Sequence, residues 1–294
     1  MSFFRDRLEA YPRLGDIEVA RTAGYWPYYK TVESAAHPRF TIEGSDYINF
    51  GSNNYLSLSY HPRVIEAAQR ATSKYGTGVT GSRLLNGTLD LHLTLEAELA
   101  EFYGAEAALV FSTGYVANVA TISGLLTRRD YAILDKDAHN SLLTGAQLSG
   151  AQMKRFAHND LGRLERILSD LPADAGKCVI VDGVYSMGGE TAPLAEMLEL
   201  CHRFPNTFLL DDEAHGVGVL GDRGLGAAEM YGVVDQVDLL TITFSKSFGS
   251  CGGALMGSPD AIELLKLDAD PLIFTASNTP GSIAAALEAL RVLR

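Results

Sequence analysis

The sequence predicts an α/β protein with a mainly parallel β-sheet and helices on both faces of that sheet. From about residue 107 onward, short apolar runs alternate with segments whose apolar residues recur at helical spacing. Strands that alternate with helices in this way pair in parallel and are buried on both sides. Polar and charged residues directly follow several of these runs, at the strand ends where open α/β sheets bind their ligands.

The chain before residue 107 is less regular. Residues 1–45 are expected to form an amino-terminal arm, because charged residues are mixed there with the aromatic cluster at 25–29. The elements expected next are a strand at 47–50, a turn at 52–55, a helix at 62–75 that opens on Pro62, and a helix at 91–103.

The alternating pattern supplies the remaining elements. Strands are expected at 108–111, 131–134, 178–181, 207–210 and 239–242. Helices are expected from about 115 to 126, from about 141, and over the Ala- and Leu-rich residues 281–294. No repeat or linker interrupts the pattern, so residues 46–294 are predicted to form one large domain.

Composition excludes several classes of function. The chain has 294 residues, of which 47% are hydrophobic and 20% charged, as in an ordinary globular protein. Its net charge of −12 argues against broad contact with nucleic acid or an anionic membrane. No apolar stretch is long enough to span a bilayer, and the charged amino terminus does not resemble a secretory signal. Three widely spaced cysteines fit neither a disulfide framework nor a zinc site, so a cytoplasmic location is expected.

Lys246 and Asp212 each follow an apolar run and together suggest one chemistry. Asp212 begins an Asp-x-x-His motif that ends at His215. A lysine can form a Schiff base with pyridoxal 5'-phosphate (PLP), and an aspartate can keep the pyridine nitrogen protonated, so that the ring accepts electrons from a carbanion at a substrate Cα. Either residue alone is more simply explained as a solvated lysine or a strand-end cap. The pair at two strand ends predicts a PLP site.

Other segments supply candidate contacts for such a cofactor. Residues 112–115 lie between an expected strand and helix, where backbone N–H groups and Gly114 could bind a phosphate, although an ordinary turn explains them equally well. Thr243 could add a further phosphate contact. His139 precedes a helix, so it is either a cap or a ring that stacks on the cofactor.

Three rival interpretations are weaker. Asp212 and His215 could ligate a metal, but no second His or Cys pair offers ligand spacing, and no metal site is predicted. Ser186 lacks the spacing of a hydrolase nucleophile elbow. Residues 76–81 match G-x-G-x-x-G literally, but they follow an expected helix rather than a strand, which argues against a dinucleotide site.

Taken together, these motifs resemble the α-oxoamine synthases, a fold-type I family of PLP enzymes, and within it most closely the bacterial serine palmitoyltransferases. The resemblance runs from about residue 49 to the end of the chain. The segments that carry it are 52–56, 76–88, 111–118, 137–139, 183–187, 212–216 and 243–249. It implies a fold-type I large domain at 46–294 that binds PLP.

The resemblance also implies a role for each matching residue. Lys246 would form the Schiff base and act as general base, His139 would stack on the ring, and Asp212 would pair with the pyridine nitrogen. The ring hydroxyl would contact His215 and Ser186. The phosphate would be surrounded by Gly114, Tyr115, Thr243 and Ser245. Asn53 would contact the substrate carboxylate, and Thr275 and Ala276 would reach the phosphate of a partner subunit, which implies a homodimer.

The same resemblance implies an activity and one departure from it. Family members condense an amino acid with an acyl thioester, carried by coenzyme A or an acyl carrier protein, and lose CO2 to give an α-amino ketone. Serine is the favoured amino acid, and 8-amino-7-oxononanoate synthase and glycine C-acetyltransferase are the alternatives. The family's carboxyl-terminal small domain, with an arginine for the substrate carboxylate, is expected to be absent from these 294 residues. A catalytically silent partner subunit is therefore the alternative from another class.

Overall fold

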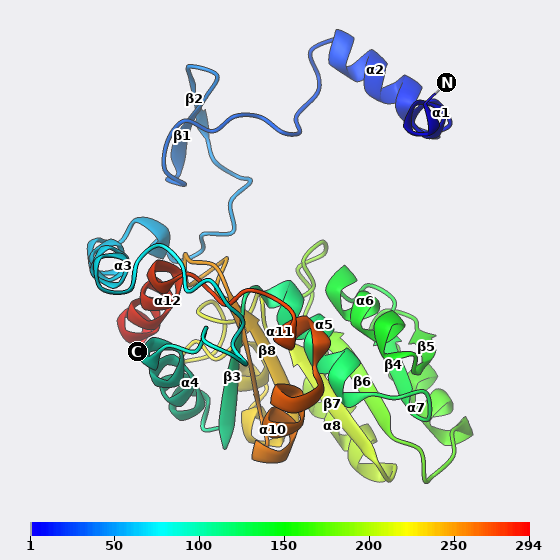
Figure 1. Ribbon diagram of the computed structural model, residues 1–294. Coiled ribbons are helices and arrows are strands. Elements are labelled where there is room, and N and C mark those ends of the chain that lie inside the picture. Colours follow the sequence, from blue (N-terminus) through cyan, green and yellow to red (C-terminus); the bar gives the residue numbers. More distant parts are fainter. Residues whose placement is uncertain (1) are drawn as a thin grey trace. The chain divides into compact units, whose positions relative to one another are not determined.

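The computed structural model describes residues 2–294, and a seven-stranded sheet lies at the centre of residues 51–294 (Figure 1). Its strands are β3 (Ala107–Phe111), β4 (Tyr131–Asp135), β5 (Gln152–Phe156), β6 (Lys177–Asp182), β7 (Thr207–Asp212), β8 (Leu239–Thr243) and β9 (Gly253–Gly257). They lie in the order β3-β9-β8-β7-β6-β4-β5. Only β9 runs antiparallel to its neighbours, β3 and β8. The mainly parallel sheet predicted from the sequence is confirmed.

Two strands of this sheet were not predicted. β5 lies at one edge, and four of its five residues are exposed, so it lacks an apolar run. β9 is bounded by Gly253 and Gly257 and is short, which hides its strand character. The five predicted strands are present, each longer by one or two residues than expected at one or both ends.

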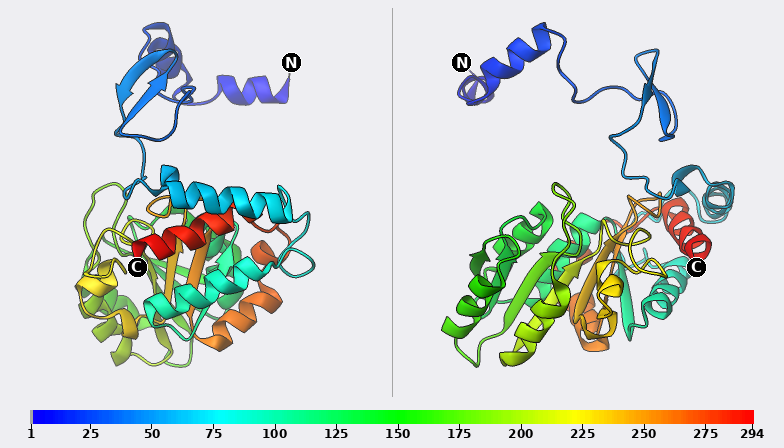
Figure 2. Two further views of the ribbon diagram at one scale, coloured as in Figure 1. Left: turned by 90° about the vertical axis from the view of Figure 1, so that its left-hand side faces the viewer. Right: turned by 180° about the vertical axis from the view of Figure 1, so that it is seen from behind.

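Helices cover both faces of the sheet, as predicted (Figure 2). One face carries α5 (Gly114–Leu125), α6 (Asn140–Ser149), α10 (Pro259–Asp268) and α11 (Asp270–Ile273). The other face carries α3 (Pro62–Tyr75), α4 (Asp90–Tyr103), α7 (Leu161–Asp170), α8 (Leu194–Arg203), α9 (Ala227–Met230) and α12 (Pro280–Leu293). α12 packs against both α3 and α4. Two 3-10 turns, η1 (Leu58–Tyr60) and η2 (Val234–Gln236), complete the elements of residues 51–294.

Alternation along the strands divides the core into two layers. Ile180 and Leu210 belong to the layer beneath α5 and α6, whereas Val179, Val181 and Leu209 belong to the layer on the opposite face. Successive side chains of a strand point to opposite faces, so this alternation also fixes the face on which each strand-end residue lies.

Residues 1–50 form a separate compact unit. It contains α1 (Phe3–Glu9), α2 (Leu14–Thr22) and a hairpin in which β1 (Arg39–Ile42) pairs antiparallel with β2 (Ser45–Ile48). Neither helix has a buried residue. The strand expected at 47–50 is β2, which begins two residues earlier and ends two residues earlier.

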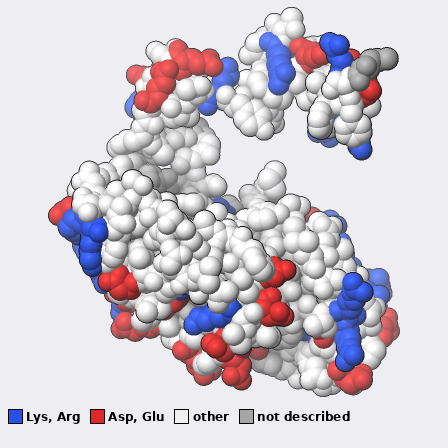
Figure 3. All heavy atoms as spheres, viewed as in Figure 1, with Lys and Arg blue, Asp and Glu red and all other residues white. Residues whose placement is uncertain are grey.

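Acidic and basic side chains are interspersed on the face of residues 51–294 seen in Figure 3, rather than gathered into one basic surface. Among residues 2–294, no helix combines the length and the apolar character that crossing a bilayer requires.

Candidate active site

A cavity of about 240 Å³ lies at the carboxyl ends of β6, β7 and β8, beside the amino-terminal ends of α5 and α6. Most of the predicted site residues line it, and they come from segments more than a hundred residues apart. Those residues are Gly114, Tyr115, His139, Ser186, Asp212, His215, Thr243, Ser245 and Lys246. The strand ends that carried the predictions therefore meet at one place.

Asp212 is the buried carboxylate at the centre of this cavity. It closes β7 and is 5% exposed. Its Oδ2 accepts a hydrogen bond from Nδ2 of Asn118 at 2.7 Å, and its Oδ1 accepts one from the backbone N–H of Ala214 at 2.9 Å. Because each oxygen has a donor, the carboxylate is held in a fixed orientation.

The neighbouring acids Asp211 and Glu213 lie on the other face of the sheet. Asp211 shares the layer of Leu209, and neither residue lines the cavity. Both are fully buried. A methyl group built on Gly183 would lie 2.7 Å from Oε2 of Glu213 and 2.9 Å from Oδ1 of Asp211, so the two carboxyl groups face the same small space.

Burial sets the protonation of these two acids. It raises the pKa of Asp211 well above its usual range, and it raises the pKa of Glu213 to about 7. Neither oxygen of Asp211 has a hydrogen-bond donor among the residues that the structure describes. Two adjacent buried carboxyl groups, of which only Glu213 has a backbone donor, avoid two neighbouring charges by keeping a proton.

His139 is held at the start of α6 by both its backbone and its ring. Its backbone N–H points at the carboxylate of Asp182, with N···O distances of 3.1 and 3.4 Å. Its Nδ1 lies 2.7 Å from Oγ of Ser141 and accepts the backbone N–H of Ser141 at 3.3 Å. Nδ1 is thus an acceptor, which leaves Nε2 as the nitrogen that carries a proton.

Asp182 was not among the predicted site residues, although it ends an expected strand. It is the register partner of Asp212 on the adjacent strand, so the two side chains lie on the same face of the sheet. Burial, and then the neighbouring Asp212, raise the pKa of Asp182 to about 8. The cavity therefore holds two carboxyl groups: Asp212 has a donor for each oxygen, whereas Asp182, among residues 2–294, accepts only the His139 backbone N–H.

Lys246 and His215 complete the polar side of the cavity. Burial lowers the pKa of the Lys246 ammonium, while Asp212 and Asp182 oppose that shift. Burial, and then the Lys246 charge, lower the pKa of His215 to about 4, so this ring is neutral near pH 7. Nδ1 of His215 lies 2.7 Å from the hydroxyl of Tyr55, another residue that was not predicted.

The other end of the cavity is built for an anion. Thr113 caps α5 by accepting the N–H of Val116, and the free N–H groups of the first turn follow it. Gly114 packs so closely on Thr243 that a Cβ on it would lie 2.6 Å from Cβ of Thr243. The hydroxyls of Thr243 and Ser245 lie 2.9 Å apart beside this turn. Backbone donors and hydroxyls at a helix amino terminus suit a phosphate.

Three predicted residues do not line this cavity. Asn53 is exposed, and its Oδ1 accepts the hydroxyl of Tyr55 at 3.4 Å. Thr275 is half-buried and Ala276 is exposed. Their roles stay predictions, and for Thr275 and Ala276 the predicted contact is with a second subunit.

Several lining residues escaped sequence reasoning: Thr113, Asn118, Ser141, Asp182, Val184, Ala214, Cys251 and Gly252. Two of them had a usable signal. Asn118 stands four residues after Gly114 on the same helix, and therefore on the same side of it. Asp182 immediately follows an apolar strand, as Asp212 does.

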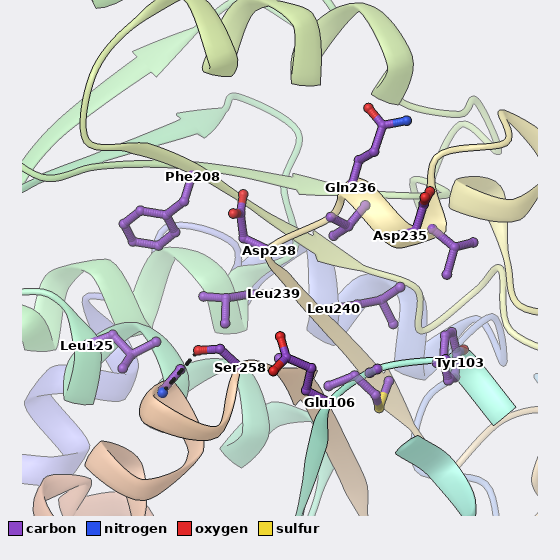
Figure 4. Close-up of a pocket in the computed structure, with 17 residues that line it drawn as sticks. Tyr103, Glu106, Leu125, Phe208, Asp235, Gln236, Asp238, Leu239, Leu240 and Ser258 are labelled. Atoms are coloured by element: carbon purple, nitrogen blue, oxygen red, sulfur yellow. Dashed lines mark hydrogen bonds between the residues drawn. The ribbon is translucent and has the colours of Figure 1, made fainter. Parts of the chain in front are cut away.

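A larger cavity, of about 550 Å³, lies at the opposite edge of the sheet (Figure 4). Phe208, Leu239 and Leu240 lie along it, and the carboxylates of Glu106 and Asp238 point into it. None of the predicted site residues lines it. Parallel sheets bind ligands at their carboxyl edge, so the smaller cavity is the candidate active site.

The structure does not support the alternative in which Asp212 and His215 ligate a metal. Within residues 2–294, the one group of three potential ligands in reach of one another is Asp135, Asp137 and His158. The oxygens of Asp135 already accept hydrogen bonds from the backbone of Asp137, the ring of His158 and the backbone of Asn159.

Comparison with known proteins adds to this geometry. The family model for class I and II aminotransferases matches residues 45–291. The serine palmitoyltransferase of Sphingobacterium spiritivorum is 42% identical over 277 residues, which cover 94% of this chain and 69% of that protein. The chain belongs to the PLP-dependent α-oxoamine synthase family.

The chain is also similar to a second type of enzyme in this family and to a solved structure. The 8-amino-7-oxononanoate synthase of Geotalea daltonii is 40% identical over 275 residues, or 93% of this chain and 70% of that protein. A solved structure of serine palmitoyltransferase with PLP has a TM-score of 0.91 and 39% identity, and the match covers 95% of this chain and 71% of the other. The family resemblance predicted from the sequence is confirmed.

Proposed function

We propose that this α-oxoamine synthase binds PLP in the 240 Å³ cavity and condenses an amino acid with an acyl thioester. The observation that carries the proposal is the meeting of Lys246, Asp212 and His139 in that one cavity. In this assignment residues 46–294 are the PLP-binding domain. The reaction joins the substrate Cα to the acyl carbon, expels the thiol and releases CO2, which leaves an α-amino ketone.

The donor set fits PLP. An amine (Lys246) suits the aldehyde, an anchored carboxylate (Asp212) suits the pyridine nitrogen, and the capped start of α5 with its neighbouring hydroxyls suits the phosphate. We assign His215 and Ser186, which line the same cavity, to the ring hydroxyl. We assign Gly114, Tyr115, Thr243 and Ser245 to the phosphate.

PLP, when bound, supplies an electron sink for negative charge at the Cα of an amino acid. The protein's own groups manage the protons. Asp212, held in a fixed orientation by its two donors, would keep a proton at the pyridine nitrogen. Lys246, whose pKa is lowered by burial, would take the Cα proton and return it. His139, whose Nδ1 accepts from Ser141, would stack on the ring and have its Nε2–H left as a donor for the substrate.

Serine with a long-chain acyl thioester is the substrate pair we favour, because the relatives at 42–45% identity are serine palmitoyltransferases. 8-Amino-7-oxononanoate synthase activity is the first alternative, and relatives of that name support it less strongly because they are 40% identical. Glycine C-acetyltransferase activity is a further alternative. Either coenzyme A or an acyl carrier protein would present the thioester, and Asn53 would contact the amino acid carboxylate. Thiol release from each thioester with serine, glycine or alanine separates these alternatives.

The cofactor assignment has a test that does not depend on turnover. Purified protein mixed with PLP is reduced with borohydride, digested and mapped for pyridoxyl. We expect the label on Lys246. A label on Lys136 or Lys266 with Lys246 free would contradict the site. A protein labelled at Lys246 that releases no thiol with any amino acid would favour a catalytically silent partner subunit.

We further propose that two copies of the chain form a homodimer, in which Thr275 and Ala276 reach the partner's phosphate. Their position outside the chain's own cavity supports this assignment. Ala276→Tyr should weaken PLP binding without changing the residues of its own cavity. Sedimentation equilibrium measures the dimer directly, and a monomer that binds PLP tightly would contradict the proposal.

We place the protein in the cytoplasm. Its three cysteines are free, and Cys251 is exposed. An exposed thiol beside a cofactor cavity suits a reducing compartment. Localisation of a tagged full chain by cell fractionation tests this assignment.

A further inference from the structure

Asn118 joins two parts of the site that the sequence keeps far apart. It lies on α5, is 3% exposed and lines the cavity. Its Nδ2 donates to Oδ2 of Asp212 at 2.7 Å and to Oγ of Ser141 at 2.9 Å. Its Oδ1 accepts the hydroxyl of Thr241, on β8, at 2.7 Å. Both atoms of this buried amide are therefore fully used.

The chemistry of the partners fixes which way this amide faces. An ionised Asp212 can only accept, so the NH2 group must point at it. The oxygen then faces Thr241, whose hydroxyl is free to donate. Thr241 is 1% exposed and packed within the sheet, so the amide is held from the side opposite Asp212.

The second N–H of Asn118 acts on His139 through Ser141. Because Oγ of Ser141 accepts from Asn118, its own hydrogen is free for Nδ1 of His139, 2.7 Å away. The backbone N–H of Ser141 also points at Nδ1. Both contacts favour the tautomer in which Nδ1 accepts and Nε2 carries the proton.

We infer that Asn118 is a positioning residue that sets the orientation of Asp212 and the tautomer of the His139 ring together. The inference rests on the proposed function, in which Asp212 holds the pyridine nitrogen and His139 covers the ring. One amide thus couples the group that binds the cofactor's nitrogen to the group that presents a donor to the substrate.

Three variants separate this role from general packing. Asn118→Leu keeps the approximate shape of the side chain and removes both donors. Thr241→Val keeps Asn118 and removes only the hydroxyl that orients it. Thr121→Val is the matched control, because Thr121 lies on the same helix, is fully buried, and has a hydroxyl without a hydrogen-bond partner among the described residues.

The first measurement needs no cofactor. Long-range ¹H–¹⁵N correlation spectra of the cofactor-free protein report the tautomer of each histidine, and His139→Phe identifies the signals of His139. We expect mainly the Nε2–H form in the unchanged protein and in Thr121→Val. In Asn118→Leu the Nδ1–H form should become populated, since the hydroxyl of Ser141 is then free to accept.

The second measurement is the dissociation constant for PLP. Loss of the hydrogen bond to the charged Asp212 should raise it about 10- to 100-fold in Asn118→Leu, and loss of the neutral bond should raise it about 2- to 10-fold in Thr241→Val. Thr121→Val should stay within about twofold of the unchanged protein, as expected when no hydrogen bond is lost.

The inference is overturned if a folded Asn118→Leu protein matches the Thr121→Val control in both the His139 tautomer and the PLP dissociation constant. Should Asn118→Leu not fold, Thr241→Val decides by the same comparison. An unchanged protein that binds no PLP at Lys246 overturns the proposed function itself, whereas normal binding with insensitive variants overturns only the role of Asn118.

Discussion

The two faces of the sheet give acidic residues at the end of β7 different environments. On the side of α5 and α6, Asp212 opens into a cavity and has a donor for each oxygen. On the other side, Asp211 and Glu213 are enclosed in the core, and Asp211 has no donor among the described residues. Chemical type and position in the chain are nearly identical. Their surroundings alone give one acid a donor for each oxygen and raise the pKa of the other two by burial.

The largest effect expected from this difference is on catalysis. Asp212→Asn should lower amino-acid-dependent thiol release by about 100-fold or more, because in the proposed site the pyridine nitrogen would lose the carboxylate that keeps it protonated. Asp211→Asn should leave thiol release within a few-fold of the unchanged protein, since the residue does not line the cavity. Equal losses in the two variants would break the comparison between the faces.

The next effect is on the free energy of unfolding, and here the acid on the core face should matter more than the acid in the cavity. Oε1 of Glu213 accepts the backbone N–H of Ala228 at 2.8 Å in the core. Glu213→Ala leaves that donor unpaired and should lower the free energy of unfolding by about 2–4 kcal/mol. Glu213→Gln keeps the acceptor and is the control. Urea unfolding measures both variants, and equal stability of the two would rule out the hydrogen bond as the cause.

The pH dependence of stability distinguishes the two faces further. Glu213 keeps its proton to about pH 7 when folded but loses it near about pH 4.3 when unfolded. The folded protein therefore binds more protons between these values, and the free energy of unfolding falls as pH rises through this window. Asp182 acts in the same direction up to about pH 8.

Each acid's share can be measured separately. Glu213→Gln should reduce the decrease in the free energy of unfolding with pH up to about pH 7. Asp182→Asn should reduce the same decrease over a range that extends to about pH 8. Urea unfolding of the cofactor-free protein across this pH range provides the measurement. A profile that keeps its full slope in both variants would mean that other groups hold the protons.

The smallest expected effect concerns the rim of the cavity. Tyr55→Phe removes the hydroxyl that contacts Nδ1 of His215 and should raise the PLP dissociation constant about two- to fivefold, the range for one neutral hydrogen bond. Tyr47→Phe, on β2 of the separate unit and not among the residues that line the cavity, is the control. An unchanged constant in Tyr55→Phe would show that His215 is held by its burial alone.

Sequence alone determined the fold class and the centre of the candidate site. The alternation of apolar runs and helical segments predicted the parallel sheet. A strand that is buried on both faces consists almost entirely of apolar residues, so it appears in the sequence as an apolar run. Lys246 and Asp212 could be found because each closes such a run, and parallel strands bring their carboxyl ends to one edge. The family resemblance assigned roles to His139, Ser186 and His215, which the sequence had already offered as candidates.

Tertiary structure decided what depends on pairing between distant segments. The apolar run that ends at Leu210 does not by itself say whether Asp211 or Asp212 faces the cavity, because the face is set by the register of β7 against its neighbours. Asp182 became a site residue only through its pairing with Asp212. The roles inferred for Asn118 depend on contacts with Ser141, Asp212 and Thr241, which lie 23 to 123 positions along the chain. Hydrogen bonds between residues so far apart in the sequence produce no periodic pattern, so they can be identified only once the sheet and helices are packed together.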